Sequence, residues 1–143
     1  MTGFKKVFID TAPLIYYLER SEQYFDKMKG FFQDCCEHNV DIVTSAVTYE
    51  EYLVYPYREN RPELIDNFEN FISSMDIRII SIDKEIARQA AKLRSKYQHF
   101  KAMDALQIAS AIRSGCDLFL TNDKQLRQET EVVCLTLDDM VFR

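Results

Sequence analysis

The sequence has no tryptophan, only three glycines and three prolines, and no long apolar run. So little glycine and proline excludes a collagen-like or low-complexity chain, and an apolar content of 47% predicts a packed core. No apolar stretch approaches the roughly 20 residues that cross a bilayer, and Lys5 and Lys6 precede an apolar run too short for a signal peptide. We therefore expect a single cytoplasmic domain over residues 1–143, with no membrane association.

The chain also lacks a cysteine framework and an excess of positive charge. Its four cysteines form no Cys-x-x-Cys pair and have no histidine at zinc-site spacing, so we expect reduced thiols. The 18 basic and 23 acidic residues give a net charge of −5. This balance argues against non-specific binding of duplex nucleic acid. It does not exclude nucleic acid altogether, because bound metal cations reverse the local sign of the charge.

One stretch near the start organises the chain. Val7, Phe8 and Ile9 are typical of a strand buried on both faces. Pro13 then occupies a favoured position in the first turn of a helix. Asp10 therefore falls where a buried strand ends and a helix begins, which is where ligands bind in open α/β sheets.

Further apolar runs alternate with amphipathic helices along the chain. The helix after the first strand is followed by others that we expect to be capped by Ser21, Ser45, Asp83 and Asn122, and by two that start near Pro62 and Met103. Strands separated by helices predict a three-layer α/β/α sandwich with a central parallel sheet of five strands. The expected strands cover residues 7–9, 41–44, 77–82, 118–121 and 132–137.

Several acidic residues lie just past a predicted strand or in the first turn of a helix. Because parallel strands bring their carboxyl ends to one edge, we expect these residues to converge there. The set consists of Asp10, Glu50 or Glu51, Asp104 and Asp123. Carboxylates gathered in one cleft repel one another, and a bound Mg²⁺ or Mn²⁺ removes that cost. Such a site can polarise a phosphodiester and activate a water.

Each acid also has a purely structural interpretation. Asp104 and Asp123 can stabilise helix N-termini through the helix dipole, and Asp10 can cap the turn before Pro13. Glu51 can complete a capping box with Thr48. The pattern alone does not choose between Glu50 and Glu51.

Four segments in order resemble the PIN domain family, and in particular the VapC-type nuclease toxins of bacterial toxin–antitoxin pairs. Val-Phe-Ile-Asp-Thr at 7–11 is similar to the opening strand and first acid of that family. Ser45, Thr48 and Glu51 resemble its Ser-x-x-Thr-x-x-Glu helix start, which selects Glu51 over Glu50. The segments 104–111 and 120–123 resemble its third-acid helix and its Thr-x-Asp segment.

The resemblance implies a Mg²⁺- or Mn²⁺-dependent endoribonuclease that acts as a toxin. Asp10, Glu51, Asp104 and Asp123 would hold the metal and orient the attacking water, and the hydroxyls of Thr11 and Thr121 would fix the carboxylates. It also implies RNA as substrate, a homodimer, and a small antitoxin that blocks the active site. The chain departs from the family pattern at Met103, where a basic or polar residue is frequent.

Two other functions compete with this one. A receiver-like phosphoacceptor module needs paired acids after the first strand and a lysine after the last, and the chain has Thr11 and Asp138 there. A PIN-fold binding module that has lost catalysis usually lacks one or more of the acids, and none is missing here.

Two clusters of side chains are compatible with binding surfaces. The basic residues Lys92, Arg94, Lys96 and Lys101 lead toward Asp104, where they can meet phosphates or simply form a solvated helix face. Half of the eight tyrosines lie within nine residues, which fits an interface with a second copy or an antitoxin, or core packing. They are Tyr49, Tyr52, Tyr55 and Tyr57.

Overall fold

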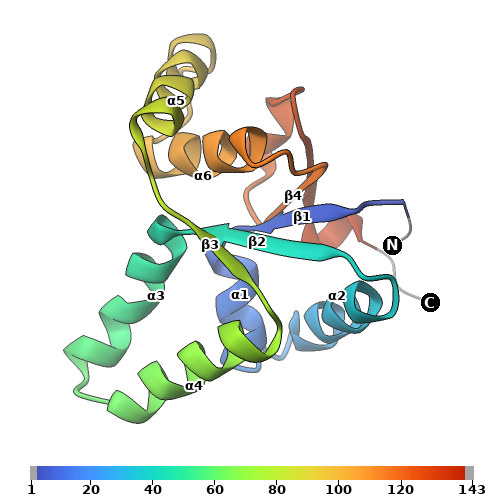
Figure 1. Ribbon diagram of the computed structural model, residues 1–143, viewed down its shortest axis with the longest axis vertical. Helices are drawn as coiled ribbons and strands as arrows, with labels where there is room; N and C mark the ends of the chain where they lie inside the picture. The colour runs from blue at the N-terminus through green and yellow to red at the C-terminus, as the bar shows by residue number, and fades with distance from the viewer. Residues whose placement is uncertain (1–2, 141–143) are drawn as a thin grey trace.

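The computed structural model describes residues 3–140, which fold around a parallel sheet of five strands in the order β3-β2-β1-β4-β5 (Figure 1). The strands are β1 Lys6–Ile9, β2 Asp41–Ser45, β3 Arg78–Ile80, β4 Leu118–Thr121 and β5 Val133–Thr136. The helices are α1 Thr11–Leu18, α2 Phe25–Glu37, α3 Ala46–Arg58, α4 Pro62–Ser74, α5 Lys84–Lys96 and α6 Ala102–Arg113. Two short 3-10 turns, η1 Lys124–Gln128 and η2 Leu137–Asp139, follow β4 and β5.

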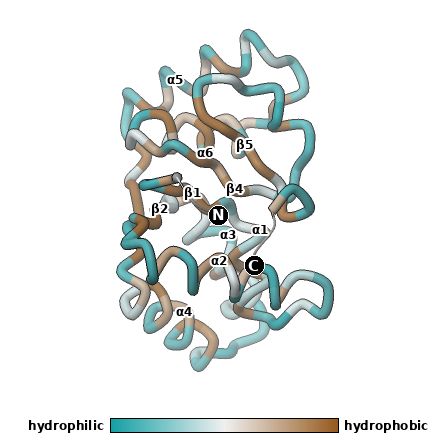
Figure 2. The backbone as a smooth tube through the Cα atoms, turned by 90° about the vertical axis from the view of Figure 1, so that its right-hand side faces the viewer, coloured by the Kyte–Doolittle hydropathy of each residue, from teal (hydrophilic) through white to brown (hydrophobic). Residues whose placement is uncertain are grey.

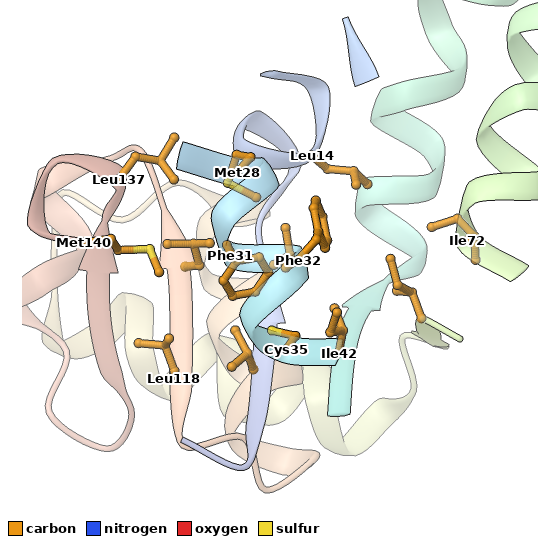
Figure 3. Close-up of a cluster of buried hydrophobic side chains, with 14 of the residues drawn as sticks. Leu14, Met28, Phe31, Phe32, Cys35, Ile42, Ile72, Leu118, Leu137 and Met140 are labelled. Atoms are coloured by element: carbon orange, nitrogen blue, oxygen red, sulfur yellow. The ribbon is translucent and has the colours of Figure 1, made fainter. Parts of the chain in front are cut away.

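Helices cover both faces of the sheet because both faces are apolar. Successive side chains of a strand point to opposite faces, so Val7 and Ile9 join one buried cluster and Phe8 joins the other. The first cluster packs under α1 to α4, where Phe31 and Phe32 of α2 lie among buried side chains of the sheet and α1 (Figure 3). The second packs under α5 and α6. The predicted three-layer sandwich is therefore confirmed.

Several predicted boundaries hold and others shift. Ser45 and Asp83 cap α3 and α5 as expected, and Gly115, with φ of 72°, follows α6 in the left-handed conformation. The predictions for Ser21 and Asn122 are wrong. The Ser21 hydroxyl accepts from the Tyr24 backbone N–H, one turn before α2 begins, and Asp123 caps η1.

The edge strands are shorter than the apolar runs that predicted them. β3 occupies 78–80 within the expected 77–82, and β5 occupies 133–136 within 132–137. Ile77 and Val132 are buried but lie outside the strands. At these ends, the apolar side chains indicate burial and not hydrogen bonding to a neighbouring strand. In the described residues, no helix combines the length and the apolar character needed to cross a bilayer.

The order of the strands determines where a site can form. From β1 the chain adds β2 and β3 on one side, then returns to add β4 and β5 on the other. The connections that leave β1 and β4 at their carboxyl ends therefore run to opposite sides, toward β2 and β5 respectively. This topological switch point is where open α/β sheets bind ligands. Asp10 and Asp123 follow β1 and β4 directly.

The two central strands are joined by an aromatic pair that predicts a large effect on stability. Phe119 of β4 is fully buried and stacks on Phe8 of β1, with ring centroids 5.3 Å apart. We expect Phe119→Ala to lower the free energy of unfolding by about 3–5 kcal/mol, because it opens a cavity between sheet and helices. Urea denaturation followed by circular dichroism measures this loss. Val54→Ala, at a side chain 41% exposed, should change it by about 0.5 kcal/mol or less.

Candidate active site

Asp10 lies at the switch point and is held by three hydrogen bonds. As the N-cap of α1, it accepts from the Thr11 backbone N–H at 2.9 Å through Oδ1. The same oxygen accepts from Gln107 Nε2 at 3.2 Å, and Oδ2 accepts from the Thr121 hydroxyl at 2.8 Å. The carboxylate is thus fixed from α1, β4 and α6 at once.

These hydrogen bonds do not fully offset the cost of burial. Desolvation raises the pKa of Asp10 above its usual value, and the negative charge of Asp104 raises it further. The bonds from Thr121, Thr11 and Gln107 act in the opposite direction. The Asp10 carboxyl is therefore harder to ionise than an exposed aspartate in the metal-free protein, although three hydrogen-bond donors stabilise its charged form.

Glu51 reaches the same edge from α3. The Thr11 hydroxyl donates to Glu51 Oε1 at 2.7 Å and also lies 3.1 Å from the Thr48 hydroxyl. Thr48 is fully buried. The capping box suggested for Thr48 and Glu51 is wrong, because Ser45 is the N-cap of α3 and accepts from the Val47 backbone N–H.

Gln107 joins the two halves of this network, although it is not among the site residues that the sequence predicts. Its amide is 2% exposed and donates from Nε2 to Thr48 Oγ1 at 2.6 Å as well as to Asp10. Its Oε1 accepts from the Ser45 hydroxyl. The signal was present, since a glutamine between Leu106 and Ile108 places a polar amide in an otherwise apolar helix segment, and a buried amide needs partners.

Asp104 and Asp123 approach the edge from the other side of β1. Asp104 is half-buried in the first turn of α6, and its pKa is raised by desolvation and by the charge of Asp123. The backbone N–H and the ammonium group of Lys101 oppose this increase. Asp123 caps η1 by accepting from the Gln125 backbone N–H at 3.0 Å, and its own N–H donates to Thr121 Oγ1 at 3.1 Å.

The structure therefore places the four predicted acids at one edge of the sheet. Glu51 is linked to this edge by the Thr11 hydroxyl. Asp104 is near enough to both Asp10 and Asp123 for their negative charges to interact. Hard divalent cations prefer such oxygen donors. Carboxylates whose pKa values are raised by one another also fit a cation, because its charge would remove that repulsion. A Mg²⁺ ion usually keeps several waters and needs only one or two protein carboxylates in direct contact. The donor set fits a divalent ion of this kind.

One other cluster meets a stricter geometric test. Among residues 3–140, the one group of three ligand atoms that all lie within 4.8 Å of one another comes from Asp34, Glu37 and His38. These residues lie at the end of α2, just before β2 begins and hence at the opposite edge of the sheet. Asp34 and His38 already interact, with 3.3 Å between Oδ1 and Nδ1. The cluster is a surface feature separate from the predicted acids.

Known structures share this fold at low sequence identity. A DNA-bound VapBC from Salmonella typhimurium has a TM-score of 0.75 at 16% identity, covering 93% of this chain and 98% of that one. A toxin–antitoxin complex from Klebsiella pneumoniae has a TM-score of 0.67 at 22% identity, with coverages of 89% and 95%. VapC20 from Mycobacterium tuberculosis, described as a sarcin-ricin loop cleaving toxin, has a TM-score of 0.64 at 14% identity, with coverages of 89% and 98%.

A comparison with curated proteins finds no match. The sequence model of the PIN domain, in contrast, matches residues 7–130, from β1 through η1. This range includes Asp10, Glu51, Asp104 and Asp123 together with Gln107. The chain belongs to the PIN domain family.

Proposed function

We propose that the protein is a Mg²⁺- or Mn²⁺-dependent endoribonuclease and the toxin of a toxin–antitoxin pair. The observation that carries this proposal is the group of four carboxylates at the switch point, where two of them have raised pKa values. Carboxylates that repel one another lower the stability of the fold, even when hydrogen-bond donors of the protein hold them. Such a group is therefore more typical of a functional site than of a purely structural one. The similar folds of toxin–antitoxin complexes and of a sarcin-ricin loop cleaving toxin also support it.

In this proposal, Asp10, Glu51, Asp104 and Asp123 would hold the ion, whose charge would make a water more acidic and the phosphodiester more electrophilic. The chain itself supplies orientation. The Thr121 hydroxyl fixes one oxygen of Asp10, and Gln107 fixes the other. The Thr11 hydroxyl directs Glu51 toward the edge. Such outer hydrogen bonds set the position and basicity of the ligands.

The second candidate is a PIN-fold binding module without catalysis. The structural interpretation of the acids favours it in one respect, because Asp10 and Asp123 both act as helix caps. Asp104 also acts at a helix start, since its carboxylate accepts from the backbone N–H of Lys101, the N-cap of α6. Capping does not account for Glu51, whose carboxylate accepts from the Thr11 hydroxyl. Capping also does not account for Gln107, whose buried amide donates hydrogen bonds to Asp10 and Thr48.

An apolar groove on α1 and α3, the helices that carry Thr11 and Glu51, fits the proposed antitoxin. It lies between α1, α3 and α4, has a volume of about 670 Å³, and includes Ile15, Leu18, Tyr52, Tyr55, Pro56 and Leu64 in its lining. Exposed Val54, Tyr55 and Tyr57 also gather on α3, which carries Glu51 at its N-terminal half. We assign the groove to an amphipathic segment of the antitoxin, which would then lie close to the active site. The homodimer and the cytoplasmic location stay predictions.

The first prediction concerns cleavage. Asp10→Asn removes a negative charge but keeps the contacts, because an amide oxygen can accept from Thr11 and Gln107 while its NH₂ donates to Thr121. We expect RNA cleavage with Mg²⁺ or Mn²⁺ to fall by about 100-fold or more, given that changes outside the ligands already cost 10–100-fold. Cleavage of total RNA, with an EDTA control, measures it. Glu50→Gln, on the same helix as Glu51, should cleave like wild type, and equal loss in both variants would contradict the assignment.

A second prediction follows from the raised pKa values of Asp10 and Asp104. The pKa of each carboxyl is higher in the folded protein than in the unfolded chain, so protonation of these two groups favours the folded state. Without metal, this contribution to the free energy of unfolding is complete below about pH 3.9 and is lost as the pH rises through the folded pKa. A divalent cation binds the ionised form of the carboxylates. The increase in melting temperature on adding Mg²⁺ should therefore become larger as the pH rises through the folded pKa values. Thermal denaturation against pH, with Mg²⁺ or EDTA, measures both effects.

The matched variants for this test are Asp10→Asn and Asp26→Asn, the latter at an exposed residue of α2. Asp10→Asn should be at least as stable as wild type in EDTA near neutral pH and should gain little from Mg²⁺. Asp26→Asn should respond to Mg²⁺ as wild type does. An unchanged Mg²⁺ response in Asp10→Asn would show that the ion binds elsewhere.

A third prediction tests the groove. Tyr55 lines it, whereas Tyr57 lies outside its lining and is 68% exposed. We expect Tyr55→Ser to weaken binding of the antitoxin encoded in the adjacent reading frame by about tenfold or more, as loss of an aromatic anchor does. Tyr57→Ser should have little effect. Calorimetric titration of the two purified proteins measures this, and equal affinities for Tyr55→Ser and wild type would exclude the groove.

A further inference from the structure

The positive charge of the chain is concentrated in one segment. Residues 84–101, which comprise α5 and the connection to α6, hold six of the 18 basic residues and one acidic residue, a local charge of +5. Since the whole chain carries −5, the remaining residues carry −10. A basic segment in an acidic protein produces a local field that attracts anions.

The basic side chains of α5 face solvent and form no ion pair with carboxylates of the described residues. Lys84, Arg88, Lys92 and Lys96 follow one another at four-residue spacing and are all exposed. Over the described part of the chain, none of them has a carboxylate within 4.0 Å, in contrast to Arg61 and Arg127. Like charges at this spacing repel one another on a helix. The row therefore lowers the stability of α5 until an anion binds along it.

The basic row leads toward the acidic site. α5 buries Ile86, Ala90 and Leu93 against α6 in the second core, and Figure 1 shows the two helices together on one side of the sheet. α5 extends to one end of the molecule and is largely hydrophilic (Figure 2). From its C-terminal end the chain runs through Lys101 into the first turn of α6, which carries Asp104. The ammonium group of Lys101 is close enough to lower the pKa of Asp104.

We propose that this basic row of α5, continued by Lys101, binds the phosphate backbone of the RNA substrate and guides it to the acids at the switch point. The inference rests on the proposed function. By helix geometry the row is about 18 Å long from Lys84 to Lys96, enough to contact several successive phosphates. The acids repel a polyanion, so a separate basic surface has to supply the affinity and register for it. An acidic protein partner is the competing occupant.

The test compares two variants with the same change in net charge. One is Arg88→Gln/Lys92→Gln/Lys96→Gln on α5, and the other is Lys29→Gln/Arg58→Gln/Arg113→Gln, at exposed residues on α2, α3 and α6. Both are made in the Asp10→Asn protein and in the wild type. Binding of a fluorescein-labelled single-stranded RNA of mixed sequence is measured by anisotropy in EDTA over a range of salt concentrations. Circular dichroism verifies the fold.

The α5 variant should bind the RNA about tenfold or more weakly at low salt. The slope of log K against log salt should become shallower by about 2, because each lost contact to a single strand contributes about 0.7. The control variant should keep the slope of the parent protein. A charge-preserving variant, Arg88→Lys/Lys92→Arg/Lys96→Arg, should restore both affinity and slope.

Four results would overturn the inference. Equal weakening in both triple variants would mean that only net charge matters. Unchanged RNA binding by the α5 variant, with cleavage by wild type intact, would place the RNA elsewhere and leave the proposed function standing. Loss of antitoxin binding with normal RNA binding would identify α5 as a protein-binding surface. If wild type neither binds nor cleaves RNA, the proposed function fails together with this inference.

Discussion

The hydrogen-bonded carboxylate of Asp10 is the constraint on which the site depends. Asp10 follows β1, is the N-cap of α1, and accepts hydrogen bonds from α1, β4 and α6. A carboxylate in this environment needs such donors because desolvation disfavours its charge. The donors in turn fix the surrounding elements, since Thr121 also accepts from Asp123 and Gln107 also bonds Thr48. One ionisable group therefore links the central strands to helices on both faces.

Much of this arrangement was predictable because it follows from local patterns. The buried run 7–9 and the residues Asp10 and Pro13 predicted a strand, a turn and a helix in that order. The parallel sheet followed from the alternation of strands and helices, and convergence of the acids followed from the parallel sheet. These steps needed no information on how distant parts of the chain pack.

The features that the sequence did not predict depend on tertiary contacts. Gln107 is a positioning residue only because α6 lies against β2 and the start of α3, and no local pattern specifies that packing. Asn122 was expected to cap the turn after β4, but its amide donates to the Tyr16 hydroxyl at 3.0 Å and Asp123 takes the cap. Short edge strands were overestimated for a similar reason, since apolar residues beyond β3 and β5 are buried by helices rather than by pairing.

We propose that the four acids at the carboxyl edge of the sheet bind a divalent cation. Anomalous X-ray scattering from crystals soaked in Mn²⁺ tests it most directly, because it locates the ion without relying on activity. We expect an anomalous peak among Asp10, Glu51, Asp104 and Asp123, and no such peak in Asp10→Asn crystals. A peak at Asp34, Glu37 and His38 alone, with none at the switch point, would contradict it.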